Sequence, residues 1–102
     1  MKIVNVYNDF MAEIKSGVTA VDFTATWCGP CKFIGPIFEK MSVNYPNAKF
    51  IKVDVDAGEQ IASEQGISAM PTFKIYKDGV VVGELVGASE GELKNLLDKH
   101  CT

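Results

Sequence analysis

Two hydrophobic periodicities alternate along this chain, and their alternation predicts an α/β protein. Apolar runs with little polar interruption are typical of strands covered on both faces, whereas apolar residues three and four positions apart are typical of helices packed on one side. Residues 18–25 form the clearest run of the first kind, interrupted only by Asp22 and by threonines. Shorter runs predict further strands at residues 3–6, 49–55, 72–77 and 80–86.

Helical spacing fills most of the segments between the predicted strands. Helices are expected at residues 8–17, 30–45, 56–66 and 89–100. Asp56 and Ser89 are each followed three residues later by a glutamate, which is the spacing of a capping box at a helix start. Pro36 lies inside the second helix. Because proline lacks an amide hydrogen and clashes with the preceding turn, we expect a kink at residues 32–36.

The last two strands are joined by Asp78-Gly79, which predicts a tight hairpin because both positions tolerate a positive φ. These strands are therefore expected to be antiparallel neighbours. The element order βαβαβαββα implies a mixed sheet with helices on both faces. With 102 residues, 47% of them hydrophobic, the chain is expected to form one α/β domain spanning residues 1–102.

Charge and hydropathy argue against several classes of partner. Ten basic and thirteen acidic residues give a net charge of -3, with no basic block to follow a phosphate backbone, so no nucleic acid is expected. No apolar run approaches membrane-spanning length, and the first residues have neither a signal-peptide core nor an Arg-rich transit pattern. We therefore expect a cytoplasmic protein in a reducing compartment, where disulfides tend to be transient and catalytic.

Two of the three cysteines lie three residues apart in the segment Trp27-Cys28-Gly29-Pro30-Cys31, where an apolar strand gives way to a helix. Cys28 falls at the helix N-terminus, where unpaired amide groups and the helix dipole favour a thiolate, and Pro30 fits the first turn at little cost. We expect Cys28 to be the accessible nucleophile in disulfide exchange. Cys31 is expected to be the more sheltered thiol, which attacks the resulting mixed disulfide.

Metal binding and hydrolysis are the alternatives to redox chemistry at this pair. Cys-x-x-Cys also occurs in zinc sites, but only His100 and Cys101 remain as a second ligand pair, and adjacent residues have unsuitable spacing. His100 falls at the helical period of three leucines, which favours helix packing or a charge at the helix end over a catalytic base. Cys101 is expected to be a thiol in a frayed tail, with a regulatory or intermolecular role as the alternative.

Two further positions are ambiguous from the residues alone. Asp22 is either a buried carboxylate with a raised pKa, suited to accept and return a proton, or an acid turned toward water at the end of its strand. The Met70-Pro71 bond is expected to be trans, because cis bonds make up only about 5 to 6% of X-Pro bonds in folded proteins.

Three segments together resemble the thioredoxin family: VDFTATWCGPCK at residues 21–32, MPT at residues 70–72 and VGA at residues 86–88. The resemblance is to the small cytosolic, eukaryote-like type, and the order of elements fits from residue 3 to residue 97. It implies the thioredoxin fold, with a central five-stranded mixed sheet flanked by four helices. It also implies a thiol-disulfide oxidoreductase that reduces protein disulfides through reversible oxidation of the Cys28/Cys31 dithiol.

The resemblance also implies roles for residues around the dithiol. Asp22 is expected to deprotonate Cys31. Met70-Pro71 becomes a cis bond beside the dithiol, with the Met70 backbone free to pair with an extended substrate segment. The implied substrate-binding surface consists of Trp27, Ala69, Met70, Pro71, Val86, Gly87 and Ala88. Ordinary core and turn packing is the competing interpretation of this surface, and it fits Val86 better than Trp27.

Other features of the resemblance concern redox direction and neighbouring charge. Gly29-Pro30 resembles the family's spacer that keeps the pair reducing, and no histidine lies between the cysteines to favour an oxidase or isomerase. Lys52 resembles a lysine that some members place near the buried acid, although a solvent-facing lysine fits the strand pattern equally well. A binding module that docks partners on the Trp27 and Met70 face, whatever its redox state, is the alternative from another class.

By resemblance, no cofactor is bound, and electrons come from NADPH through thioredoxin reductase to the redox-active disulfide. The implied targets are disulfide-bearing proteins such as peroxiredoxins, ribonucleotide reductase and methionine sulfoxide reductase. Gly58, Gln65 and Ala69 stand where vertebrate members have extra cysteines, which argues against regulation or dimerisation through secondary disulfides. The chain is therefore expected to be a monomer.

Overall fold

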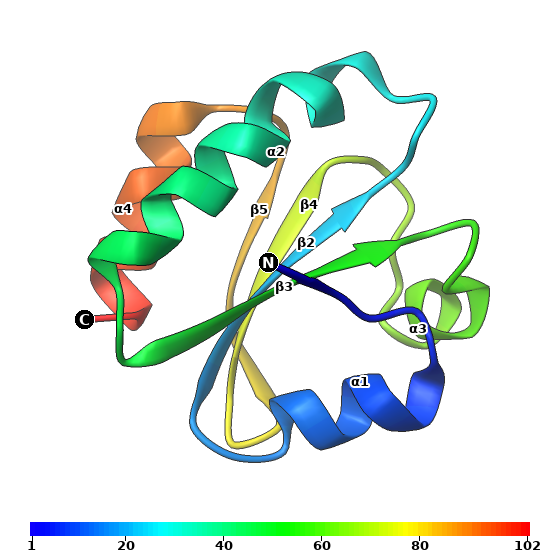
Figure 1. Ribbon diagram of the computed structural model, residues 1–102, viewed down its shortest axis with the longest axis horizontal. Helices are drawn as coiled ribbons and strands as arrows, with labels where there is room; N and C mark the ends of the chain where they lie inside the picture. Colours follow the sequence, from blue (N-terminus) through cyan, green and yellow to red (C-terminus); the bar gives the residue numbers. More distant parts are fainter.

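A mixed five-stranded sheet forms the centre of the protein, with helices on both of its faces (Figure 1). The computed structural model describes residues 1–102. In chain order the elements are β1 (Lys2–Ile3), α1 (Tyr7–Ile14), β2 (Val18–Thr24), α2 (Gly29–Met41), a short 3-10 helix (Ser42–Asn44), β3 (Ala48–Asp54), α3 (Glu59–Glu64), β4 (Thr72–Lys77), β5 (Val80–Val86) and α4 (Glu90–His100). The strand order is β1-β3-β2-β4-β5, with β1, β3 and β2 parallel and β4 antiparallel to both of its neighbours. This confirms the predicted α/β architecture.

The hairpin between β4 and β5 is formed as the sequence predicts. Asp78 and Gly79 have φ values of 50° and 86°, in the region that the turn requires. The Asp78 carboxylate also accepts a hydrogen bond of 2.8 Å from the amide of Gly17. The turn is therefore tied to the start of β2.

The central strand β2 carries side chains into two separate cores. Val21 and Phe23 join the core on the side of α1 and α3, whereas Ala20 joins the core on the side of α2 and α4. Figure 1 shows these two helix pairs on opposite sides of the sheet. Burial on both faces explains why this strand lacks polar alternation.

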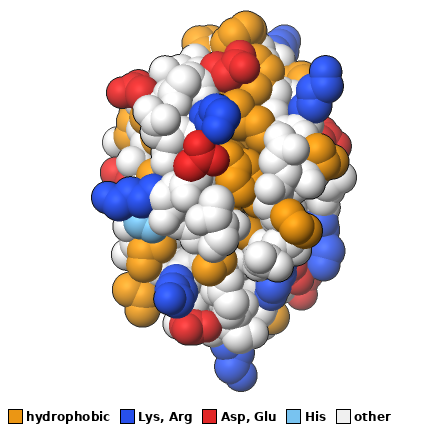
Figure 2. Space-filling model, turned by 90° about the vertical axis from the view of Figure 1, so that its left-hand side faces the viewer, with side chains coloured by type: hydrophobic (Ala, Val, Ile, Leu, Met, Phe, Trp, Pro, Cys, Tyr) orange, Lys and Arg blue, Asp and Glu red, His pale blue; other side chains and the backbone are white.

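Helices α2 and α4 cover the same face of the sheet. Figure 2 shows a band of hydrophobic side chains between charged groups on this side of the molecule. Underneath, α4 lies so close to β5 that a Cβ atom added to Gly83 would be 2.7 Å from His100 Nε2 and 2.9 Å from Leu96 Cδ1. His100 is therefore a helix-packing residue, one of the two roles predicted for it.

Two predictions at helix and strand starts need correction. The first strand covers Lys2–Ile3 rather than residues 3–6, because Val4 turns into the core and the Asn5 side chain accepts a hydrogen bond of 2.9 Å from the amide of Asp54. Asp56 does not cap α3, whose N-cap residue is Gly58 without a side-chain hydrogen bond. Instead, the carboxylate of Asp54 accepts hydrogen bonds from the amides of Asp56 and Ala57. A Cβ on Gly58 would lie 3.0 Å from the Asp54 carbonyl oxygen.

The start of α4 agrees with its predicted cap, whereas the end of α2 differs from its prediction. Ser89 Oγ accepts a hydrogen bond of 3.3 Å from the amide of Glu92, as its capping spacing predicts. Helix α2 continues through Pro36 to Met41 and then tightens into the 3-10 helix, so it ends earlier than residue 45 as a regular α-helix. The kink at residues 32–36 stays a prediction.

Cys101 is not in a frayed tail, contrary to expectation. Its amide donates a hydrogen bond of 2.8 Å to the carbonyl of Leu97, and its side chain is only 2% exposed. Burial raises the pKa of the Cys101 thiol to about 11. The C-terminal turn is held down by Tyr45, whose hydroxyl donates to the Asp98 carboxylate at 2.5 Å. Cys101 is therefore a structural part of the core between α2 and α4.

Candidate active site

The cysteine pair lies where β2 ends and α2 begins. Cys28 is the N-cap residue of α2, and its Sγ accepts a hydrogen bond of 3.2 Å from the amide of Cys31. Pro30 lies in the first turn, where a missing amide hydrogen leaves no helical bond unmade. Cys28 and Cys31 form a disulfide across one turn, with their Cα atoms 5.2 Å apart. The Cys-x-x-Cys spacing thus produces a disulfide at a helix start, as the sequence implies.

In the disulfide form Cys28 is less accessible than predicted. It is 5% exposed and Cys31 is 3% exposed, so the expected contrast between an open and a sheltered thiol is nearly absent. The reason is that Cys28 packs against Ala25 and Met70, with its Sγ 3.8 Å from the Met70 carbonyl oxygen. Met70 therefore covers part of Cys28 in the disulfide form.

The Met70-Pro71 bond is cis, as the family resemblance implies and contrary to the expectation from the residues alone. Two hydrogen bonds fix the surrounding backbone. Thr72 Oγ1 donates to the carbonyl of Ala69 at 2.6 Å, and the amide of Gly87 donates to the carbonyl of Pro71 at 2.9 Å. The second bond brings the end of β5 against the loop that carries Met70.

Exposed apolar side chains lie on the elements that lead to and from this region. Trp27 is 64% exposed immediately before the disulfide, and Val86 is 56% exposed at the end of β5. The indole Nε1 of Trp27 donates a hydrogen bond of 2.9 Å to the Asp56 carboxylate. Sequence reasoning missed this role of Asp56, because its partner lies 29 positions away and no local pattern marks the pair.

Asp22 is fully buried on β2, so the alternative of an acid turned toward water is excluded. Neither oxygen of its carboxylate has a hydrogen-bond partner. Burial raises the pKa of Asp22 to about 7, and the positive charge of Lys52 partly opposes that rise. Lys52 is the register partner of Asp22 on β3, which accounts for its influence.

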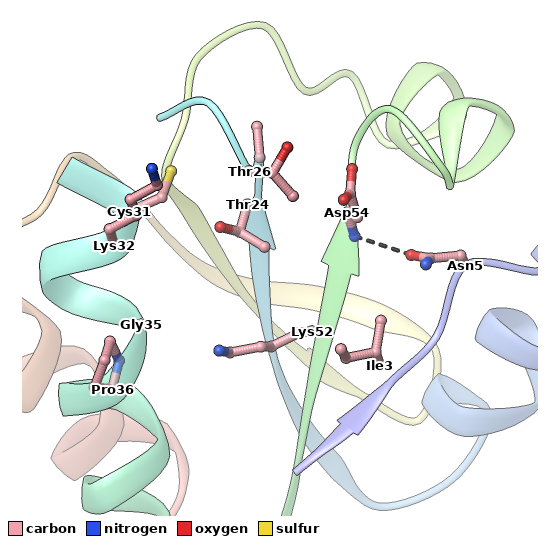
Figure 3. A pocket seen from close by; sticks show the side chains of 11 residues that line it. Ile3, Asn5, Thr24, Thr26, Cys31, Lys32, Gly35, Pro36, Lys52 and Asp54 are labelled. Carbon is pink, nitrogen blue, oxygen red and sulfur yellow. Dashed lines mark hydrogen bonds between the residues drawn. The ribbon is translucent and has the colours of Figure 1, made fainter. Parts of the chain in front are cut away.

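A cleft of about 540 Å³ opens between α2 and the strands β1, β2 and β3 (Figure 3). Cys31 lies on one wall, and Lys52 points across the cleft toward Gly35 and Pro36 of α2. A Cβ on Gly35 would be 3.5 Å from Lys52 Nζ, so the lysine reaches α2. The cleft is lined by Ile3, Asn5, Thr24, Ala25, Thr26, Cys31, Lys32, Gly35, Pro36, Lys52 and Asp54.

No three His, Cys, Asp or Glu side chains come together in an arrangement that could hold a metal ion. None of the helices combines the length and the apolar character that crossing a membrane requires.

Comparison with known proteins places this site in a family. The model of the thioredoxin family matches residues 2–99. The H-type thioredoxin of Chlamydomonas reinhardtii is 59% identical over 81 residues, which are 78% of this chain and 72% of that protein. The solved structure of Plasmodium falciparum thioredoxin has a TM-score of 0.95 at 44% identity and covers 97% of this chain and 98% of its own.

A further solved chain is 38% identical with a TM-score of 0.89, and the match covers 96% of this chain and 94% of that one. It comes from a structure concerned with the thiol-resolving mechanism of a yeast mitochondrial 1-Cys peroxiredoxin through the glutathione and thioredoxin systems. Thioredoxins exchange dithiols and disulfides through a redox-active cysteine pair, without a metal or prosthetic group. The family model, these relatives and the Cys28-Cys31 disulfide show that the chain belongs to the thioredoxin family and is a thiol-disulfide oxidoreductase.

Proposed function

We propose that this thiol-disulfide oxidoreductase works as a protein-disulfide reductase, in which Cys28 attacks and Cys31 resolves. The observation that carries the proposal is the position of Cys28 at the N-cap of α2. There the Cys31 amide, 3.2 Å from Cys28 Sγ, faces the sulfur and favours its thiolate form once the disulfide is reduced.

The exchange balances in two steps. The Cys28 thiolate attacks one sulfur of the target disulfide, which forms a mixed disulfide and releases the other target sulfur as a thiolate. Cys31 then loses its proton and attacks Cys28 Sγ, which restores the Cys28-Cys31 disulfide and releases the second target thiolate. Two electrons pass to the target, whose two sulfurs take up protons to become thiols.

Asp22 is proposed to accept the proton that Cys31 loses. With a pKa of about 7, the Asp22 carboxyl is divided between its two protonation states near neutral pH, so it can both take and return a proton. Its oxygens have no hydrogen-bond partner that would compete for this role. Lys52 is the register partner of Asp22 and lines the same cleft as Cys31.

The proposed substrate-binding surface surrounds Cys28. An extended segment of the target would pair with the Met70 backbone in the manner of an added strand, while apolar side chains cover its flanks. This surface consists of Trp27, Ala69, Met70, Pro71, Val86, Gly87 and Ala88. Gly29 and Pro30, the spacer between the cysteines, are proposed to keep the pair reducing.

The proposal extends to the electron supply and the setting of the protein. Thioredoxin reductase would regenerate the dithiol with electrons from NADPH, which makes the chain an electron carrier. Peroxiredoxins, ribonucleotide reductase and methionine sulfoxide reductase are the proposed targets, and the peroxiredoxin context of one structural relative supports the first. We further propose a monomeric, cytoplasmic protein formed by one domain.

Reduction of insulin by the protein with thioredoxin reductase and NADPH, in the absence of dithiothreitol, tests the mechanism. Cys28→Ser should abolish turnover, and Cys31→Ser should accumulate a mixed disulfide with the target. Cys101→Ala is the matched control, since it removes a cysteine outside the site and should leave turnover intact. Full turnover by Cys28→Ser would show that the assigned mechanism is wrong.

Two other functions make different predictions. An isomerase or oxidase would have a reduction potential of about -180 mV or higher, so titration against glutathione separates it from a reductase. If the protein is a binding module, the wild type and the Cys28→Ser/Cys31→Ser double variant should bind partners with equal affinity.

A further inference from the structure

A buried lysine lies on β4, on the far side of the sheet from α2. Lys74 is only 9% exposed, and its register partner Val21 belongs to the core beneath α1 and α3. A buried ammonium is costly unless its hydrogens are satisfied. Lys74 Nζ donates a hydrogen bond of 2.6 Å to the carbonyl of Gln65 and lies 3.4 Å from the half-exposed carboxylate of Glu84. The lysine is therefore a charged tie between β4 and the end of α3.

A second side chain of β4 also forms a hydrogen bond with Gln65. The Tyr76 hydroxyl donates a hydrogen bond of 2.6 Å to Gln65 Oε1. The Tyr76 ring is 1% exposed and meets Phe10 edge-on at 5.7 Å, so the hydroxyl is fixed by packing. Both the backbone and the side chain of Gln65 are thus bound to one rigid strand.

Gln65 is the point at which α3 ends and the loop at residues 66–71, here called the Met70 loop, begins. It is the C-cap residue of α3, which has no basic side chain in its last turn, so Lys74 supplies the positive charge that the free carbonyls of a helix end attract. Gly66 follows with a φ of 69° and turns the chain sharply. At the far end, Thr72 Oγ1 holds the carbonyl of Ala69 at 2.6 Å.

The loop at residues 66–71 is therefore fixed at both ends by side chains of β4. We propose that Lys74 and Tyr76, acting through Gln65, are positioning residues that set the Met70 backbone where a substrate segment can pair with it. This inference rests on the proposed function, in which the Met70 backbone receives an extended target. Changes at these residues should therefore affect substrates unequally. Protein disulfides bind through the Met70 backbone, whereas a small disulfide reacts with Cys28 without using the loop.

The test compares a protein disulfide with a small aromatic disulfide, dithiobis(nitrobenzoate), as substrates of the full chain. Lys74→Met keeps the aliphatic length but removes the charged hydrogen bond, so KM for insulin should rise about fivefold to tenfold with little change in kcat. The rate with the small disulfide should stay within about twofold of the wild-type rate. Amide hydrogen exchange at residues 66–70 should become faster.

Three variants make the result specific. Lys74→Arg keeps a charged donor and should bring KM back to within about twofold of wild type. Glu84→Gln removes the longer ion pair while leaving the bond to Gln65, and should leave KM unchanged. Tyr76→Phe keeps the buried ring and should raise KM by about twofold, which preserves the test if Lys74→Met does not fold.

Two results would overturn the inference. One is a folded Lys74→Met or Tyr76→Phe protein with the wild-type KM for insulin. The other is an equal slowing with both substrates, which would indicate general damage to the dithiol. Failure of the wild type itself to reduce insulin would instead contradict the proposed function, so the two failures are distinguishable.

Discussion

Replacing Asp22 by Asn should stabilise the oxidised protein, and the gain should depend on pH. Asp22 is fully buried and both of its oxygens lack hydrogen-bond partners. The folded protein therefore disfavours the carboxylate, while a neutral carboxyl and an amide have nearly the same shape and polarity. Asparagine removes the buried charge without creating a cavity.

The size of the gain follows from the pKa of Asp22, which burial raises from 3.8 to about 7. A group with a raised folded-state pKa binds more protons when folded than when unfolded, so wild-type stability falls as pH rises between these two values. At about 1.4 kcal/mol per pKa unit, the loss is about 4 kcal/mol above pH 7 and about 2 kcal/mol at pH 5. The unfolding free energy of Asp22→Asn should exceed that of the wild type by these amounts, and the two should be almost equal below pH 4.

Urea unfolding from pH 4 to pH 9, with linear extrapolation of the unfolding free energy, measures this gain. Glu64→Gln is the matched control, because Glu64 is exposed and makes no ion pair, and its effect should stay within about 0.5 kcal/mol at every pH. A gain for Asp22→Asn that is constant across the pH range, or absent at pH 8, would refute the assignment of the cost to a buried charge.

Three other outcomes are expected. In stopped-flow measurements of a preformed mixed disulfide, Asp22→Asn should slow the attack by Cys31 at least about tenfold and leave the first attack unchanged; equal slowing of both steps would contradict the proton-accepting role. Gly83→Ala should cost about 1 kcal/mol in urea unfolding, because the added Cβ would lie 2.7 Å from His100 Nε2. Adding His100→Ala should recover part of that cost, and strict additivity of the two changes would argue against the clash. In the oxidised protein, Cys101 should react with a thiol reagent only as fast as the chain unfolds locally, and rapid labelling under native conditions would show that the tail is open.

The regular elements were predictable because their signals are local. The mostly apolar run of β2 is typical of burial on both faces, and the Asp78-Gly79 turn fixes its own backbone geometry. The cysteine pair was equally clear, since its spacing matches one helical turn. In these cases the residues that determine the structure are neighbours in the chain.

The remaining features depend on partners that are distant in the sequence. Asp56 fits the spacing of a cap, but its carboxylate binds the Trp27 indole instead. The position of Cys101 near the end of the sequence suggests a frayed tail, but the hydrogen bond between the Tyr45 hydroxyl and the Asp98 carboxylate fixes the last helical turn. Lys74 interrupts an apolar strand, and the carbonyl that accepts its hydrogen bond lies nine positions earlier. No periodicity encodes such pairs, because only the packed fold brings them together.

The two cysteines of the disulfide have different neighbours. Cys28 lies against the Met70 loop, whereas Cys31 lines the cleft that contains Lys52. In the proposed mechanism, a target bound on the Met70 side covers Cys28, whereas the cleft lies beside Cys31. Electrons would then leave through Cys28, while the proton of Cys31 would leave on the side of the cleft, so the two transfers would take place on different sides of the disulfide.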